Sequence, residues 1–580
     1  MKRLIPSFLL PLLLLCSGCN LDDPLNPYGQ GNESYTDDPV DPVNPDTSIE
    51  DPFELEDEED AIANTSFDRT ISVVFSASGA KVTGDDNGIV TVVGNNVTVN
   101  QTGDEKIRYD LSGTASDGFF KIYGEKKQAI VLNSLDLTNP NGAAINNQNK
   151  KRTFVVVNGT NQLADGSKYS ATPEGEDEKG AFFSEAQLIF SGSGSLSVTA
   201  TGGKAGISSD DYVRVLDGPA ITVNSAKGHG IRGKDAVVIG GGTLDITVKK
   251  DGKKAITSDG TVRIDGGKTT LTVSGGVDDS DLTDLSSSSG IKADAAFVMY
   301  DGSLAITNSG QGGKGISGDA GGLIAGGTVD ISVTGSNYEV TGADAVGLED
   351  TSCSAKGIKF DGKLVITGGT VTVSAKSHEA IEAKGEMIIT GGDVYATSSD
   401  DALNSGSNMI IGGGRIFARS TGNDGIDANG NCYIQGGIVY AIGSNTPEVA
   451  VDANTEEGYK LYVIGGTLVA VGDLERGSHL SQACWSATAS KNTWHGLYAD
   501  GKLAFAFMTP SYDCTLVVST SGTTTLSSGV TVSGDTFLQG MGAGSASGGS
   551  SVALSAYTSS GGMGGPGMGG PGGGPGGPGR

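Results

Sequence analysis

Histidine, cysteine and aromatic residues are scarce in this sequence, and their scarcity excludes several kinds of site. The 580 residues include four His and six Cys, and aromatic residues make up 6% of the chain. The histidines have no triad spacing, and there is no Cys-x-x-Cys pair or zinc-ligand spacing. The sequence therefore gives no sign of a catalytic triad or a zinc module.

Basic residues are also few relative to acidic ones. There are 39 Lys and Arg against 68 Asp and Glu, which gives a net charge of -29. A nucleic-acid backbone would be repelled by such a chain, so nucleic acid is not an expected partner. The acidic balance suits cation binding, or solubility after export.

The hydrophobic run near the N-terminus, residues 4–15, is too short to span a bilayer as a stable helix. It follows a basic start and ends in small residues before Cys19, which resembles a bacterial lipobox, although Cys16 is unusual at its position. We expect residues 1–19 to be a lipoprotein signal peptide with acylation at Cys19. That lipid would be the only membrane attachment and would hold the protein at the bacterial outer membrane or cell surface. A plain secretory signal is the alternative.

Two segments of biased composition flank the part that we expect to fold. Between residues 22 and 60 there are about fifteen acidic residues and no Lys or Arg. We therefore expect residues 20–65 to form an acidic disordered tether. Residues 541–580 consist largely of Gly, Ser, Met and Pro, which predicts a disordered tail.

Glycine, in contrast, is abundant, with 93 residues. Between residues 191 and 472 one phrase recurs: an apolar residue, Gly-Gly or Asp-Gly, a polar residue, and a short alternating strand. The last glycine of the turn recurs every 22–25 residues apart from three longer gaps, of which the two longest contain inserts near residues 278–289 and 337–354. Short strands at this period, with no helical stretch between them, predict an all-β fold, a right-handed single-stranded parallel β-helix.

The segments on either side of the repeat are also expected to be β-structure. Residues 66–190 contain several runs of β-branched and aromatic residues, and should form an N-terminal cap and the first coils. In residues 473–540 the glycine phrase stops while strand-like runs continue. This segment should form a small β cap that covers the strand edges at the end of the solenoid.

In a β-helix, residues at the same position of successive turns stack about 4.8 Å apart, so polar columns can be read from the repeat. Two columns flank the Gly/Ala-Ile phrase of each turn, and both change from neutral or basic residues to acidic ones at Glu379. Adjacent carboxylates at this spacing repel each other unless a cation lies between them, and this number of oxygen ligands suits Ca²⁺. We therefore predict calcium on the late coils, the alternative being a solvated acidic stripe. The predicted ligands are Glu379, Glu382, Asp401, Asn404, Asp424, Asp427 and Asp452.

A third column, on the strand after Gly-Gly, becomes aromatic on the same turns. Exposed aromatic faces are platforms for pyranose rings, and arginine side chains can pair with uronate carboxylates. The alternative is an aromatic stack that only braces adjacent turns. The predicted carbohydrate contacts are Tyr395, Phe417, Tyr440, Arg415 and Arg419.

Several motifs carry a family resemblance. They are Tyr-Asp-Leu-Ser-Gly-Thr at residues 109–114, Val-Leu-Asn at 131–133, Gly-Thr-Asn-Gln-Leu-Ala-Asp-Gly at 159–166 and Asp-Gly-Ile at 424–426. In this order they resemble the bacterial carbohydrate-binding domain family of exported right-handed β-helix proteins. The resemblance implies a fold similar to that of polysaccharide lyases, bound calcium, and binding of cellulose or acidic pectic polymers of the plant cell wall. The early coils depart from the pattern, since His229 and Lys254 stand at the Asp position, so calcium is implied for the late coils only.

Together these features predict a monomeric, non-catalytic protein that binds polysaccharide on a calcium-bearing face of the β-helix. A calcium-dependent polyuronate lyase is the first alternative, with Lys376, Lys384, Arg415 or Arg419 as the base. A structural adhesin without a glycan site is the second.

Overall fold

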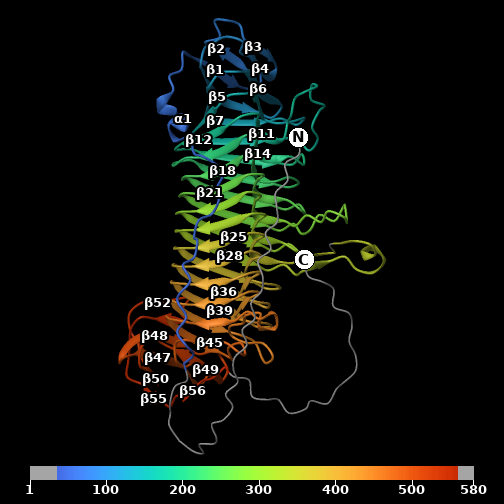
Figure 1. Cartoon of the computed structure of the whole chain (residues 1–580). Helices are drawn as coiled ribbons and strands as arrows, with labels where there is room; N and C mark the ends of the chain where they lie inside the picture. Colours follow the sequence, from blue (N-terminus) through green and yellow to red (C-terminus); the bar gives the residue numbers. More distant parts are fainter. Residues whose placement is uncertain (1–35, 350, 560–580) are drawn as a thin grey trace, which may run out of the picture.

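The computed structural model describes residues 36–349 and 351–559. These residues form a β-solenoid of about 15 turns with 3% helix, which confirms the predicted all-β parallel β-helix (Figure 1). The predicted signal peptide, Cys19 and the end of the predicted tail lie outside the described residues. Within the described part of the chain, no helix is long and apolar enough to cross a membrane.

Each turn of the solenoid contributes one strand to each of three stacks, and neighbouring strands within a stack are parallel. One turn consists of β17 (Ile231–Gly233), β18 (Ala236–Ile239) and β19 (Thr243–Val248), after which β20 (Lys254–Ser258) begins the next. We call the stack of β17 the polar stack, the stack of β18 the strap stack and the stack of β19 the cap stack, after features described below.

The polar stack is a sheet of fourteen strands that starts with one antiparallel pair and continues in parallel. Besides β17 and β20 it contains β3 (Val90–Val93), β4 (Asn95–Asn100), β6 (Gly118–Gly124), β8 (Ile145–Asn149), β11 (Gly180–Ser184), β14 (Ala205–Ser209), β23 (Ser289–Ala293), β26 (Lys314–Gly318), β31 (Lys356–Phe360), β34 (Ile381–Ala383), β37 (Leu403–Ser405) and β40 (Ile426–Ala428).

The strap stack and the cap stack are joined at β7 (Gln128–Thr138), which pairs with strands of both. Besides β18, the strap stack contains β9 (Thr153–Asn158), β12 (Leu188–Gly192), β15 (Tyr212–Val215), β21 (Thr261–Ile264), β24 (Ala296–Met299), β27 (Gly321–Ile324), β32 (Leu364–Ile366), β35 (Met387–Ile389), β38 (Met409–Ile411), β41 (Cys432–Ile434), β43 (Leu461–Val463) and β45 (His479–Leu480). Besides β19, the cap stack contains β10 (Thr160–Ala164), β13 (Ser195–Ala200), β16 (Ala220–Ser225), β22 (Lys268–Val273), β25 (Ser303–Asn308), β28 (Thr328–Val333), β33 (Thr370–Ala375), β36 (Asp393–Ser398), β39 (Arg415–Ser420), β42 (Ile438–Ile442) and β44 (Thr467–Val471).

The N-terminal end of the solenoid is closed by the first strands of the chain. There β1 (Arg69–Phe75) pairs antiparallel with β2 (Lys81–Thr83) and parallel with β5 (Ile107–Ala115), which leads into β7. The antiparallel hairpin covers an edge that would otherwise expose unpaired backbone groups.

The repeated Gly-Gly phrase forms the turn between the strap stack and the cap stack. The last glycine of the phrase has a left-handed backbone, as at Gly242 with φ +70° and Gly267 with φ +75°. A Cβ at Gly267 would lie 2.6 Å from the backbone of Gly241 in the preceding turn. Glycine is therefore needed both for the conformation and for the close approach of successive turns.

The two longer gaps in the repeat are inserts, as predicted, and both precede strands of the polar stack (Figure 1). The second insert is a hairpin of β29 (Tyr338–Glu339) and β30 (Ser352–Cys353). The hydroxyl of Tyr338 donates a hydrogen bond of 2.7 Å to Asp279 of the first insert. The inserts therefore support each other beside the middle of the polar stack.

The C-terminal β segment is larger than predicted. The sequence predicts a cap over residues 473–540 and disorder from 541, but the structure shows paired strands to Ala556. Small Gly- and Ser-rich strands form here because each finds an antiparallel partner in the cap. The strands are β46 (Cys484–Ala489), β47 (Trp494–Ala499), β48 (Lys502–Met508), β49 (Cys514–Ser519), β50 (Thr524–Ser528), β51 (Thr531–Val532), β52 (Thr536–Phe537), β53 (Gly542–Ala543), β54 (Ala546–Ser547), β55 (Ser550–Val552) and β56 (Ser555–Ala556).

The cap does more than close the end of the solenoid. β49 pairs antiparallel with β44 and with β46, which extends the cap stack. A separate six-stranded sheet that includes β47, β48 and β50 lies against the outer face of the cap stack (Figure 1).

The described part of the predicted tether is not a free spacer. Residues 36–60, which we call the N-terminal strap, run along the outer face of the strap stack from the last turn back toward the first (Figure 1). At the far end the backbone N–H of Asp37 donates to the carbonyl of Leu480 at 3.1 Å. Farther along, the amide of Gln435 makes two hydrogen bonds with the backbone of Val43, at 2.9 and 2.7 Å.

The strap ends in α1 (Asp57–Asp60), where an acidic residue is buried against two arginines. Asp60 is 1% exposed and accepts from the hydroxyl of Tyr212 at 2.6 Å and from Arg214 at 2.8 Å. Arg152 lies 2.8 Å from the other side of the same carboxylate. Phe53 packs edge-on against Tyr212, with ring centroids 5.2 Å apart. The acidic composition that predicts disorder is thus compensated by basic residues far away in the sequence.

We expect Asp60→Asn to release the end of the strap, because it leaves Arg152 and Arg214 buried without a full counter-charge. Removing one partner of a buried pair costs about 3–5 kcal/mol, so amide hydrogen exchange in residues 53–60 should accelerate at least about 100-fold. Glu54→Gln, at an exposed position of the same strap, is the control and should change exchange little. Equal exchange in both variants would show that the ion pairs do not hold the strap.

Candidate functional site

The parallel register confirms the first acidic column. Glu382 pairs with Asn404, and Asn404 pairs with Asp427. A bridge between Ile426 and Val451 continues the ladder by one turn and places Asp452 next in the column. The predicted residues are therefore neighbours on successive strands of the polar stack.

The second acidic column lies just before these strands and connects successive turns. The backbone N–H of Asp424 donates to the carboxylate of Asp401 at 3.0 Å, and the N–H of Val449 donates to the carboxylate of Asp424 at 2.5 Å. Glu379, Asp401 and Asp424 are all buried. These carboxylates therefore have a structural role in addition to any ligand role.

The first two carboxylates already have a cation. The ammonium of Lys356 lies 3.1 Å from Glu379 and 2.6 Å from Glu382. Burial by itself would raise the pKa of Glu379, but the hydrogen bond from His378 and the charge of Lys356 lower it. A metal ion at these two residues would have to compete with Lys356.

The aspartates of the following turns have no such partner. Burial, together with the neighbouring carboxylates, raises the pKa of Asp401 to about 8 and that of Asp427 to about 7. The same causes raise the pKa of Asp424 to about 6. Burial and a hydrogen bond with Glu475 raise the pKa of Asp452 to about 9. Within the described residues, no Lys or Arg forms an ion pair with these four groups, so either protons or a bound cation must neutralise them.

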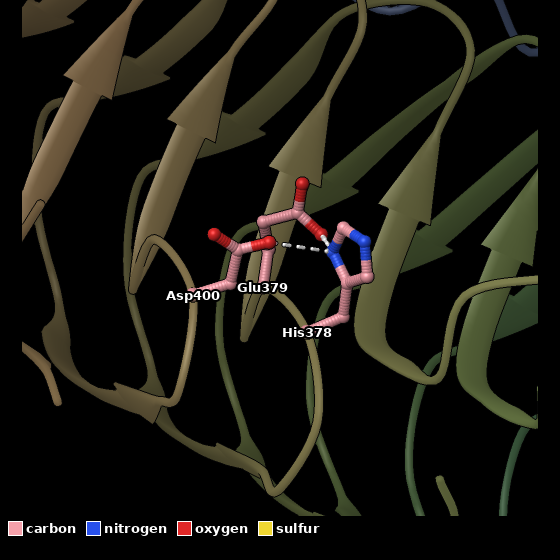
Figure 2. Close-up of side chains that lie close together, drawn as sticks. All are labelled: His378, Glu379 and Asp400. Carbon is pink, nitrogen blue, oxygen red and sulfur yellow. Dashed lines mark hydrogen bonds and ion pairs between the residues drawn. The ribbon is translucent and has the colours of Figure 1, made fainter. Parts of the chain in front are cut away.

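Next to this ladder the structure shows a cluster that the sequence analysis missed. Figure 2 shows the imidazole of His378 beside the carboxylates of Glu379 and Asp400, with one ring nitrogen facing both. Its Nδ1 lies 3.0 Å from Asp400 and also contacts Glu379, and one ligand atom from each residue lies within 4.8 Å of the others. His378 and Asp400 each directly precede a member of the second column. They belong to a neighbouring column that lies one residue earlier in each turn, and counting along the repeat identifies it in the same way. The three residues could hold a divalent cation or share a proton.

The aromatic column has the predicted register, but only part of it is accessible. Tyr395 pairs with Phe417, and Phe417 pairs with Tyr440. Phe417 is 1% exposed and Tyr440 is 0% exposed, because the six-stranded sheet of the cap packs over them. The prediction that Phe417 and Tyr440 contact a sugar is therefore wrong, and bracing of adjacent turns and of the cap is their role.

At the edge of this covered region, a groove of about 830 Å³ lies between the cap stack and the cap. Its floor consists of adjacent outward residues on three turns: Thr370 and Thr372, then Asp393 and Tyr395, then Arg415. Its wall is the segment 535–540 of the cap. We call this space the cap groove.

Tyr395 presents one ring face to the cap groove. The other face stacks on Phe417, with ring centroids 4.8 Å apart and planes 9° from parallel. The stack ends at Tyr395, because the same position of the preceding turn is Thr372, which is much smaller than an aromatic ring. Space for a flat group therefore exists above the free face of Tyr395.

Polar groups surround that space. The guanidinium of Arg415 pairs through two nitrogens with Asp393 and lies 4.1 Å from the ring centroid of Phe537. Gln539 donates a hydrogen bond of 3.2 Å to the hydroxyl of Thr372. Gln539 and the preceding Leu538 both have left-handed backbones, with φ of +53° and +52°. Strain of this kind in non-glycine residues is typical of functional loops.

The remaining predicted contact, Arg419, is partly buried and does not line the cap groove. A second stacked aromatic pair lies on the strap stack, where the rings of Tyr433 and Tyr462 are 4.9 Å apart. Both tyrosines are partly exposed, as Tyr395 is. This pair is not among the predicted sugar contacts, because those come only from the strand after Gly-Gly, whereas Tyr433 and Tyr462 lie on the strand before it.

We expect the metal-free protein to lose stability as the pH rises from 6 to 9. The four aspartates have folded-state pKa values of about 6 to 9, above their ordinary 3.8, so the folded state binds more protons in this window. Their stabilising contribution is complete below 3.8 and is lost as the pH passes through the raised values. For Asp401 and Asp427 the slope should be at most about 1.4 kcal/mol per pH unit each, reduced by solvent screening.

Thermal unfolding in EDTA at each pH measures this dependence. Asp427→Asn should flatten the pH profile, since it removes one of the titrating groups. Asp344→Asn, at an exposed position of the second insert, is the control and should leave the profile unchanged. A profile that is flat in the parent protein would contradict the raised pKa values.

Comparisons with known proteins give one family and one solved structure. A family described as carbohydrate-binding domain-containing protein matches residues 93–402, which include most of the polar stack up to β34 but neither β37 and β40 nor the C-terminal cap. Among solved structures, a polysaccharide lyase-like protein from C. thermocellum, studied as a gadolinium derivative, is 20% identical, with a TM-score of 0.36 over 44% of this chain and 97% of that chain. At that level of similarity it carries no functional argument. No curated protein matches. Because the matched residues make up more than half of the chain, this protein belongs to the carbohydrate-binding domain-containing family.

Proposed function

We propose that this protein binds polysaccharide non-catalytically, and that the cap groove is a sugar-binding site. The single observation that carries the proposal is that Tyr395 lines the cap groove at the end of the aromatic stack. Membership of a carbohydrate-binding family supports the ligand class. The lipid anchor at Cys19 and the cell-surface location stay predictions from the sequence.

A pyranose ring is well matched to this position. It can continue the stack on Tyr395 where Thr372 leaves room, at about the 4.8 Å spacing of the turns. The hydroxyls of Thr370 and Thr372 and the carboxylate of Asp393 border the same space and are suitable partners for sugar hydroxyls. Arg415 is held in place by Asp393 and Phe537, so it can donate to a ligand without first being ordered.

We expect Tyr395→Ala to weaken retention of the protein on polysaccharide about tenfold, because the loss of one stacked ring removes roughly 1.5 kcal/mol of contact. Affinity electrophoresis in gels that contain cellulose derivatives or pectate gives the apparent dissociation constants. Tyr433→Ala is a matched control, since it removes a partly exposed, stacked tyrosine from the other face of the solenoid.

The two variants separate the possible outcomes. Loss of retention in Tyr395→Ala alone supports the cap groove. Loss in Tyr433→Ala alone would move the site to the strap stack and overturn the proposal. If the parent protein is retained on no polysaccharide, a structural adhesin is the remaining alternative. Release of unsaturated product would instead favour a lyase.

We further propose that Ca²⁺ binds to the carboxylates of the late coils. Support comes from four buried or partly buried aspartates on adjacent turns without a basic partner among the described residues, and from Asn404 in the same column. Their oxygens are the ligand type that Ca²⁺ prefers. Glu379 and Glu382 would join the site only if Lys356 moved aside.

We expect Ca²⁺ to raise the unfolding temperature, and its affinity to increase with pH between 6 and 8. Binding must displace protons from the aspartates, so each proton displaced should change the affinity about tenfold per pH unit. Isothermal titration calorimetry at three pH values measures this, with Asp401→Asn as the test and Asp344→Asn as the control. Equal calcium affinity in both variants would show that the ladder is not the calcium site.

A further inference from the structure

The column that contains His378 and Asp400 has the opposite charge in the early turns of the polar stack. The residues directly before β11 and β14 are Lys179 and Lys204, and the corresponding positions in the next two turns are Gly228 and Lys253. These residues, with His229 and Arg232, line a pocket of about 320 Å³ that contains no acidic lining residue. We call it the basic pocket.

Gly228 stands in the middle of this column and lies close to the backbone of the preceding turn. A Cβ at Gly228 would lie 1.8 Å from the carbonyl oxygen of Lys204, so the close approach of the two turns requires glycine. Lys204 and Lys253 are two turns apart, and their backbones are therefore separated by about 10 Å. Gly228 belongs to the turn between them and lines the same pocket without contributing a side chain.

His229 adds a neutral donor to the basic pocket. Its Nδ1 accepts a hydrogen bond of 3.1 Å from the backbone N–H of Lys254, so the proton of the neutral ring must be on Nε2. Burial, and then the charges of Lys254, Lys253 and Arg232, lower the pKa of His229 to about 3, so that the ring is neutral over the working range of pH. The imidazole can therefore donate from Nε2 while it adds no charge.

The positive charges of the basic pocket are only partly compensated. Lys179 pairs with Asp177 at 2.7 Å and with Asp210 at 2.6 Å, and Arg232 pairs with Asp259 at 2.8 Å, so carboxylates already neutralise these two side chains and hold them in place. Lys204 and Lys253 form no ion pair with any of the described residues. On a chain with a net charge of -29, a pocket lined only by donors and cations is a local exception.

We propose that the basic pocket binds an oxyanion, a carboxylate or sulfate group, between Lys204 and Lys253 over Gly228. The pocket itself is argued from these contacts alone. Its identification as a contact for an acidic substituent of the bound polysaccharide rests on the proposed function. The site lies in turns distant from the cap groove, so one long polymer chain could occupy both, whereas a free anion would occupy only the basic pocket.

The test compares the parent protein with the double variant Lys204→Ala/Lys253→Ala. Calorimetric titration with sodium sulfate, and separately with an oligomer of galacturonic acid, should show at least a tenfold loss of affinity in this variant and weaker binding at higher salt. The control, Lys249→Ala/Lys268→Ala, removes two exposed lysines near the cap stack and the same net charge. It should bind as the parent does, and circular dichroism verifies that all proteins are folded.

Each outcome decides the inference. Equal losses of affinity in both double variants would show that net charge alone causes the effect, and would overturn the site. Unchanged binding in Lys204→Ala/Lys253→Ala would also overturn it. Binding of sulfate but not of the oligomer would overturn the glycan assignment. Retention of the same variants on a neutral polysaccharide tests the cap groove separately. A failure of the proposed sugar site is therefore distinguishable from a failure of the basic pocket.

Discussion

Parallel pairing of strands at about 4.8 Å decides where every distinctive side chain of this protein lies. Because each turn places its residues directly over those of the turn before, similar residues accumulate in columns. Apolar columns give a continuous core, whereas carboxylate columns generate repulsion that must be offset. Lys356 offsets the repulsion between Glu379 and Glu382. Asp401 and Asp427 on the following turns have raised pKa values, so they depend on protons or a cation.

The same stacking divides the polar stack into two electrostatic halves. The early turns present lysines beside Gly228 and His229, and the late turns present aspartates beside His378. The boundary is the pair of turns in which Lys356 reaches Glu379. A ligand with acidic groups and a bound cation would thus meet complementary charge along a single face, since the rungs of both halves are continuous.

A solenoid also has long outer faces, and here the two ends of the described chain cover two of them. The N-terminal strap lies on the strap stack, and the C-terminal sheet lies on the late turns of the cap stack. Both coverings bury apolar or aromatic residues that the repeat exposes, such as Phe417 and Tyr440. Neither covering lies over the polar stack. The cap groove forms where the C-terminal sheet ends. The two coverings therefore determine which repeated side chains of the strap stack and the cap stack can contact a ligand.

The repeat, the strand register of the acidic columns and the aromatic column are predictable from the sequence, because each follows from counting along a regular period. The sequence did not determine that the acidic segment before residue 60 binds Arg152 and Arg214, or that Gly- and Ser-rich strands beyond residue 540 join the cap. It also missed that Lys356 neutralises two of the predicted ligands and that two of the predicted sugar contacts are buried. These features depend on contacts between residues far apart in the chain. No local period relates such partners, so the contacts become visible only in the folded structure.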